Sequence, residues 1–143
     1  MAFGTLGLGR HRLDGPSGGG MFQELLVLVT EEFAGAPVPA VVQQVAMACL
    51  KEHRGLLRGE VLGPAGVLVD GTRMEALFVA SPVYFPDEFA TVVEDGREIR
   101  IVWLVPITGS EAAFVRERGS DAFEDLLMEA DPNLMDLSRK AVV

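Results

Sequence analysis

The sequence Ile99-Arg100-Ile101-Val102-Trp103-Leu104-Val105-Pro106-Ile107-Thr108-Gly109-Ser110-Glu111 decides how the chain folds. Its first part, Ile99 to Val105, combines Ile, Val and Trp and therefore predicts a central strand, with Trp103 as a core residue. Its end carries Thr108-x-x-Glu111, the pattern of a capping box. In a capping box the Thr hydroxyl accepts from the third helical amide while the Glu side chain reaches back to the cap amide. A strand therefore passes directly into a helix.

Two helices are expected after this junction. The first ends at Gly119, and Ser120 can begin the second. The second helix has an apolar stripe on one side and acidic residues on the other, and Pro132 closes it. The stripe consists of Phe123, Leu126, Leu127 and Ala130.

Upstream of the junction, Leu25 to Val29 is a short continuous apolar run, which predicts a strand covered on both faces. The clearest helix has Pro39 in its first turn and is expected to stop at Gly55. Its apolar face follows helical spacing and consists of Val38, Val41, Val42, Val45 and Cys49. Further strands joined by tight turns are predicted from the apolar segments that alternate with Gly and Pro. They are Val61-Leu62, Val67 to Val69 and Met74 to Ala80.

These elements predict an α+β fold: a mixed, largely antiparallel sheet with helices packed on it. Residues 1–20 are rich in glycine, which favours turns or a flexible loop. We therefore divide the chain into a Gly-rich, flexible N-terminal segment at residues 1–20 and one domain at residues 21–143.

The chain is acidic, with 21 Asp and Glu against 12 Lys and Arg and a net charge of −9. Residues 60–143 hold 16 acids and seven bases, which equals this whole charge. Such a surface repels phosphate backbones, so nucleic acid is excluded as a partner. The acidity either serves solubility or forms a face that steers a basic partner protein, and both interpretations stay open.

The cysteine count and the start of the chain indicate the compartment. Cys49 is the only cysteine, so no internal disulfide forms. Charged residues from Arg10 to Asp14 interrupt the region where a signal peptide needs an apolar run. No stretch approaches the roughly 18 apolar residues of a membrane span. We expect a cytoplasmic protein with no membrane partner.

The sequence contains no convincing catalytic, metal or cofactor pattern. Cys49 and His53 are four residues apart on the predicted helix, so they can share a face. Two ligands are too few for a structural zinc site, and nothing marks an oxyanion hole or an orienting acid for a Cys–His nucleophile. Gly15 to Gly20 lacks the GxxxxGK[ST] pattern of a phosphate-binding loop. We predict a non-enzymatic protein without metal or cofactor.

Six short motifs along the chain carry a resemblance to a known family. Three lie in the last third: Val102 to Glu111, Gly119 to Phe123, and Asp136 to Val143. Three lie upstream: Thr5 to Leu8, Glu24 to Leu26, and Phe78 to Pro82. As a set they resemble the suppressor-of-fused family, whose pattern includes Thr-x-Gly-[ML]-Ser, Glu-Leu, Pro-[IL]-[ST]-x-x-Glu, Gly-x-x-[AL]-[LF] and Asp-x-x-Arg-x-x-Val.

The sequence departs from the family pattern in three ways. Gly9 stands where the family has Ser, and Lys140-Ala141 stands where Pro/Arg-Ser is usual. The family domain normally has further strands before the Thr-x-Gly segment. The resemblance therefore implies either a shortened domain or a gene model that begins late, and with either alternative one sheet edge lacks its covering strand and exposes unpaired backbone groups.

The resemblance also implies a mode of action. In animals such domains bind and restrain transcription factors in Hedgehog signalling, and bacterial stand-alone members have been proposed as immunity proteins of toxin systems. The family has no catalytic residues to carry over. We therefore expect an immunity-type protein that neutralises a partner toxin, with a basic toxin as the favoured partner. The alternatives are a regulatory adaptor or scaffold that binds an extended peptide at a sheet edge, and an enzyme that uses carboxylates or Cys49 with His53.

The interface candidates come from loops that combine aromatic and acidic residues. Pro82 and Pro86 flank two aromatic residues and stiffen their loop, so the rings either plug the core or anchor a partner. With the neighbouring acids, they form our predicted interface. It consists of Tyr84, Phe85, Asp87, Glu88, Glu94 and Asp95.

Overall fold

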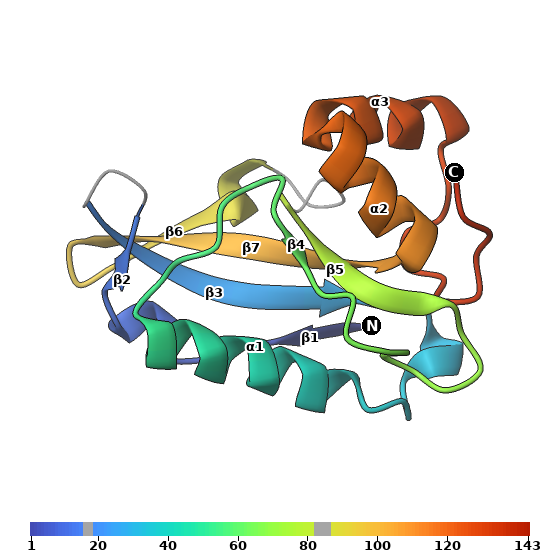
Figure 1. The fold of residues 1–143 in the computed structure, drawn as a ribbon. Helices are drawn as coiled ribbons and strands as arrows, with labels where there is room; N and C mark the ends of the chain where they lie inside the picture. Colours follow the sequence, from blue (N-terminus) through green and yellow to red (C-terminus); the bar gives the residue numbers. More distant parts are fainter. Residues whose placement is uncertain (16–18, 82–86) are drawn as a thin grey trace.

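A computed structural model describes residues 1–15, 19–81 and 87–143, and these form a seven-stranded sheet with helices on both faces (Figure 1). The strands are β1 (Ala2–Gly4), β2 (Leu13–Asp14), β3 (Gly20–Leu28), β4 (Val61–Leu62), β5 (Met74–Ala80), β6 (Thr91–Glu94) and β7 (Arg97–Thr108). The helices are α1 (Val38–Glu52), α2 (Gly109–Arg118) and α3 (Ser120–Ala130). Short 3-10 turns are η1 (Leu8–Arg10), η2 (Glu31–Phe33) and η3 (Asp87–Ala90).

The strand order is β1-β3-β7-β5-β4, with β2 added to β3 and β6 added to β7. Among the described strands, β3 and β7 are the one parallel pair, and the other pairs are antiparallel. The predicted mixed, largely antiparallel α+β sheet is confirmed. Trp103 of β7 lies opposite Leu26 on one side and Ala80 on the other, and it is 1% exposed. Both the central strand and the core position of Trp103 are therefore confirmed.

The sheet separates two hydrophobic cores. Leu25 and Val27 of β3 face the core beneath α1, which includes Val42 and Cys49. Leu26 and Leu28 face the second core, which includes side chains of α2 and α3. Because successive side chains of a strand point to opposite faces, a strand between two such layers must be apolar at every position. This explains the continuous run that predicted β3, and Figure 1 shows α1 on one face and α2 and α3 on the other.

The strand-to-helix junction at Thr108 has the predicted capping box. The amide of Glu111 donates to Thr108 Oγ1 at 3.2 Å, and the amide of Thr108 donates to Glu111 Oε1 at 2.9 Å. Gly119 then ends α2 and Ser120 begins α3, as predicted. In the described ranges no helix is both long enough and apolar enough to cross a membrane.

The same glutamate binds an arginine from the C-terminal segment. Arg139 Nη1 donates to Glu111 Oε2 at 2.8 Å, and Nη2 donates to Oε1 at 2.9 Å. The amide of Val142 also donates to Oε2, at 3.0 Å. The Glu111 side chain is 0% exposed and that of Arg139 is 5% exposed. One buried carboxylate therefore joins the end of β7, the first turn of α2 and the C-terminal segment.

The pKa of Glu111 reflects these opposing influences. Burial by itself raises the pKa of this carboxyl because it disfavours the charged form. The hydrogen bonds from Arg139 and from the amides of Thr108 and Val142 favour the carboxylate and outweigh burial. The pKa of Glu111 consequently lies below its ordinary value, and the side chain is ionised at neutral pH.

A tight turn places Arg139 for this contact. The amide and hydroxyl of Ser138 both donate to Asp136 Oδ1, at 2.9 and 2.7 Å. These bonds lower the pKa of Asp136. The amide of Arg139 donates to the carbonyl of Asp136, and Leu137 between them is buried. The Asp-x-x-Arg pattern is therefore a turn that directs an arginine into the core.

The N-terminal segment contains elements that its composition did not indicate. Residues 2–4 and 13–14 form β1 and β2, both paired with β3. Leu8 and Leu13 are buried in the core beneath α1. Burying these two leucines offsets part of the conformational entropy that a Gly-rich chain loses on ordering. Residues 16–18 lie outside the described residues.

Three local details differ from the sequence predictions. Val67 to Val69 is not a strand, because Gly66 has φ 92° and the amide of Leu68 closes a turn onto the carbonyl of Met74. Helix α1 ends at Glu52 and is capped by His53, which takes the left-handed conformation (φ 54°) two residues before Gly55. Strand β6 was not predicted at all.

The buried ion pair predicts a large effect of removing one partner. R139M leaves the Glu111 carboxylate buried without its cation and should lower the free energy of unfolding by about 3–5 kcal/mol. Urea unfolding followed by circular dichroism measures this. K140M, at the exposed neighbouring position, is the matched control and should change stability little. Equal stabilities of the two variants would contradict the role given to the pair.

The lowered pKa of Glu111 predicts a dependence on pH. Because this pKa is lower in the folded than in the unfolded chain, its contribution to stability is complete above the ordinary glutamate pKa and is lost as pH falls through the folded value. E111Q lacks this titration. Between about pH 5 and pH 3 the free energy of unfolding should therefore fall less steeply in E111Q than in the wild type. Parallel curves for the two proteins would show that the ionisation of Glu111 is not linked to folding.

Candidate functional site

Cys49 and His53 do not form a reactive pair in the structure. Cys49 is buried among core residues, and burial raises the pKa of its thiol. His53 is exposed at the end of α1, where its backbone caps the helix. Within residues 1–15, 19–81 and 87–143, no three His, Cys, Asp or Glu side chains gather in a way that could hold a metal ion.

The predicted interface residues lie around the β6–β7 hairpin, as far as the structure describes them. Glu88 in η3, Glu94 at the end of β6 and Asp95 in the turn are exposed. Asp87 is the first residue of η3. Tyr84 and Phe85 lie outside the described residues.

The β6–β7 hairpin adds exposed apolar side chains to these acids. Asp95 and Gly96 have φ 52° and 76°, and Glu94 pairs with Arg97, so the strands are joined by a two-residue turn. Val93 is 72% exposed. The sequence did contain the signal for this hairpin, since Thr91 to Val93 is β-branched and precedes Asp-Gly.

Helix α3 carries an acidic stripe. Asp121, Asp125 and Glu129 are spaced four residues apart and are all exposed, so they project from one side of the helix. Residues 120–131 contain no Lys, Arg or His. This stripe is the most concentrated charge on any described helix, and it can attract a positively charged surface.

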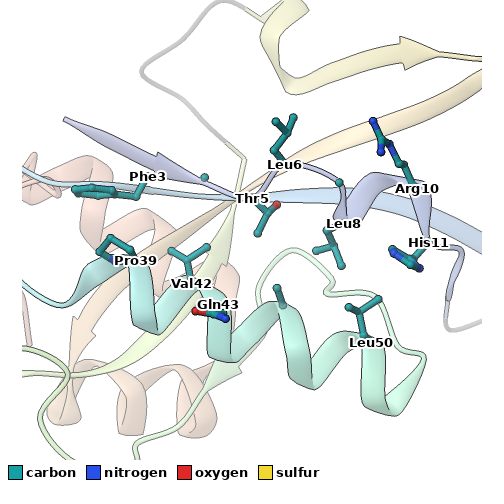
Figure 2. Close-up of a pocket in the computed structure, with 13 residues that line it drawn as sticks. Phe3, Thr5, Leu6, Leu8, Arg10, His11, Pro39, Val42, Gln43 and Leu50 are labelled. Atoms are coloured by element: carbon teal, nitrogen blue, oxygen red, sulfur yellow. The ribbon is translucent and has the colours of Figure 1, made fainter.

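A groove, which we call the edge groove, lies between the N-terminal segment and α1 (Figure 2). Its volume is about 560 Å³, within the range of about 300–1,000 Å³ typical of ligand sites. One side consists of residues 3–8 with Arg10 and His11. The other side is α1, through Pro39, Val42, Gln43, Ala46 and Leu50. Sequence reasoning missed this groove because its two sides are far apart along the chain.

The corner that forms one side of the groove is fixed by Glu24 of β3. Thr5 Oγ1 donates to Glu24 Oε1 at 2.6 Å and accepts from the amide of Leu25 at 2.9 Å. The amide of Gly7, which has φ 112°, donates to Glu24 Oε2 at 3.0 Å. These contacts join two of the motifs that carried the family resemblance. They leave Leu6 99% exposed at the rim of the groove.

Gly9, which departs from the family pattern, is packed closely in this corner. A Cβ at Gly9 would lie 2.8 Å from the Ile99 side chain and 3.1 Å from Glu24 Oε2. A larger residue there requires the Ile99 side chain to shift. The glycine therefore matches the close approach of η1 to the sheet in this chain.

The fold and these surfaces define a class of protein: a single-sheet α+β domain that presents a groove and charged faces. The family model "Suppressor of fused protein (SUFU)" matches residues 1–140. The chain belongs to the suppressor of fused family, and the resemblance read from its motifs is confirmed. No curated protein matches the chain significantly.

Solved structures share this fold at low sequence identity. A suppressor-of-fused homologue from Neisseria gonorrhoeae has a TM-score of 0.67 and 20% identity, with 85% of this chain and 63% of that chain covered. The Sufu–Fu complex has a TM-score of 0.70 and 12% identity, with 99% of this chain and 69% of that chain covered. Drosophila Suppressor of Fused has a TM-score of 0.73 and 14% identity, with 99% of this chain and 38% of that chain covered. The chain thus spans less than two thirds of the Neisseria and Drosophila proteins.

The burial of Cys49 predicts an unreactive thiol. Because burial raises the pKa of the Cys49 thiol and core residues cover its sulfur, a chromogenic aromatic disulfide should modify the native protein at least about ten times more slowly than the protein in urea. A free cysteine peptide in the same buffers corrects for the effect of urea on the reagent. Equal rates in the folded and unfolded protein would show that the thiol is accessible.

Proposed function

We propose that the protein acts by binding another protein without catalysis, most concretely as an immunity-type protein that neutralises a partner toxin. The observation that carries this proposal is membership of the suppressor of fused family, over residues 1–140. A structure that shares the fold is that of the Sufu–Fu complex, in which a Sufu protein is bound to a partner. The family is not known as an enzyme family.

The charge distribution supports a basic partner. Residues 60–143 contain 16 acids and seven bases, and the α3 stripe of Asp121, Asp125 and Glu129 concentrates part of this charge. Toxins that attack nucleic acid need a basic surface to hold phosphates. An acidic face opposite such a surface accelerates encounter and disfavours acidic competitors.

The hairpin candidates supply the contact itself in this proposal. Val93 offers exposed apolar surface next to Glu94 and Asp95, and an interface needs apolar contact surrounded by polar residues. Tyr84 and Phe85, which lie outside the described residues, remain candidate anchors on the basis of the sequence alone. The α3 stripe then governs how fast the partner arrives, and the hairpin governs how long it stays.

The proposal predicts that the protein protects a cell from the toxin encoded beside its gene. Co-expression should restore growth, and the two purified proteins should form a specific complex. Reversal of the α3 stripe (D121K, D125K and E129K) should lower the association rate constant by about tenfold or more at low salt. Reversal of two exposed interface candidates, Glu88 in η3 and Glu94 in the hairpin (E88K and E94K), should mainly raise the dissociation rate constant.

A matched control reverses three exposed acids elsewhere. E31K, E32K and E52K together change the net charge as much as the α3 variant does, at positions that are also exposed. This control should associate at a rate closer to that of the wild type. If no neighbouring gene product is neutralised and no protein is bound specifically, the proposed function is wrong.

A second candidate function is a regulatory adaptor that binds an extended peptide at a sheet edge. The observation that favours it is the open edge of β1, which pairs only with β3 among the described strands. Extended peptides add to such edges through main-chain hydrogen bonds. An adaptor, unlike an immunity protein, binds its peptide without protecting a cell from a toxin.

A further inference from the structure

We propose that a pocket between α3 and the sheet receives one large apolar side chain of a partner protein, and that Lys or Arg residues surround this side chain in the partner. We call this site the α3 pocket. The inference rests on the proposed protein-binding function and specifies an anchor for the partner. The pocket is formed by residues of β5, β7 and α3, among them Phe78, Ala80, Trp103, Val105, Leu127 and Met128.

The base of the α3 pocket is apolar and already in place. Phe78 lies opposite Val105, and Ala80 lies opposite Trp103, in the β5–β7 ladder. These side chains belong to the core on the face of the sheet opposite α1 (Figure 1). The ring of Phe78 also packs edge-on against Phe123 of α3, with 5.1 Å between the ring centroids. Because the core holds this base, receiving a ligand requires little rearrangement.

The apolar stripe of α3 is covered at its start and uncovered at its end. Phe123 is 0% exposed, whereas Leu127, one turn later, is half-buried and Met128 is 74% exposed. Ala80 and Leu134, which also line the pocket, are half-buried. The described residues therefore leave apolar surface open at the end of α3. An exposed methionine suits a binding surface, because its unbranched side chain adapts to the shape of a partner.

The size of the α3 pocket matches one side chain. Its volume is about 270 Å³, which is below the range of about 300–1,000 Å³ typical of sites that enclose a whole small molecule. Protein interfaces commonly obtain much of their binding energy from one large side chain that fills a pocket on the partner. We therefore assign the pocket to a side chain of a protein.

The charge around the pocket defines the neighbours of that side chain. Among the described residues that line the pocket, Arg58 is the one cation, and its guanidinium is paired with Glu124 at 2.7 Å. Asp131 also lines the pocket and is exposed. Asp125 of the α3 stripe lies three residues before Met128, so the stripe runs beside the rim. Lys and Arg next to the anchor are attracted to this rim, and Asp and Glu are repelled.

Three synthetic pentapeptides test the inference directly. The Phe peptide is acetyl-Lys-Lys-Phe-Lys-Lys-amide, the Ala peptide has Ala in place of Phe, and the acidic peptide has Glu in place of each Lys. Each is titrated into the full chain while the methyl resonances of Ala80, Leu127 and Met128 are followed. The Phe peptide should shift these resonances and bind at least about tenfold more tightly than the Ala peptide. The acidic peptide should bind at least about tenfold more weakly than the Phe peptide at low salt.

Two substitutions alter the pocket and leave the α3 stripe intact. A80L fills the pocket from the sheet and should weaken binding of the Phe peptide about tenfold or more. M128A removes apolar surface at the rim and should weaken it about threefold. M47A is the matched control, because Met47 is a helical methionine that is 59% exposed and does not line the pocket. If circular dichroism shows that A80L does not fold, the comparison of M128A with M47A decides.

Several outcomes would overturn the inference. It fails if the Phe and Ala peptides bind equally, if the methyl resonances of the pocket do not shift, or if M128A binds the Phe peptide as tightly as M47A. It also fails if nuclear Overhauser contacts show that another segment of the chain, or a second copy of it, fills the pocket in the free protein.

The failure of the pocket inference is distinguishable from that of the proposed function. If the partner of the proposed function binds wild type, A80L and M128A equally, protein binding stands and the pocket inference alone is wrong. If the Phe peptide fills the pocket but no protein is bound specifically and no toxin is neutralised, the proposed function is wrong and the selectivity of the pocket stands.

Discussion

The structure depends on one buried carboxylate, that of Glu111. It accepts from the amide of Thr108, from the guanidinium of Arg139 and from the amide of Val142. A buried ion pair adds little stability relative to a well-packed apolar core, but losing one partner is costly. The carboxylate thus permits one arrangement of the C-terminal segment on the β7–α2 junction. Two family motifs, distant in sequence, are the two halves of this single interaction.

A second carboxylate, in the middle of β3, organises the N-terminal segment in a similar way. Glu24 holds the corner of Thr5 and Gly7 against β3. Again two motifs of the family meet at one side chain. Since β3 and β7 are the paired central strands, these two glutamates fix the N-terminal and C-terminal segments onto the same framework. The fixed corner at Thr5 is also what gives the edge groove its shape.

The exposed surfaces of the domain differ in charge, and the functional proposals depend on that difference. The α3 stripe and the hairpin are acidic, while the edge groove is apolar with a positive end. In the proposed function, a basic surface of the partner meets the acidic faces, and this contact requires no bond-making chemistry. The buried thiol of Cys49, which is the one cysteine of the chain, belongs to the core beneath α1.

The sequence by itself determined the long elements: β3, β5, β7 and the three helices follow from apolar periodicity and from the Thr108 capping box, which are local properties. Short elements needed the tertiary structure. Strands β1 and β2 form only because β3 supplies their partners, and Val67 to Val69 has strand-like residues without a partner strand. The Glu111–Arg139 pair spans 28 residues, and the groove joins residues 3–11 to α1. Such contacts form only when the chain has folded. Periodicity is a property of neighbouring residues, whereas the proximity of distant residues depends on the tertiary structure.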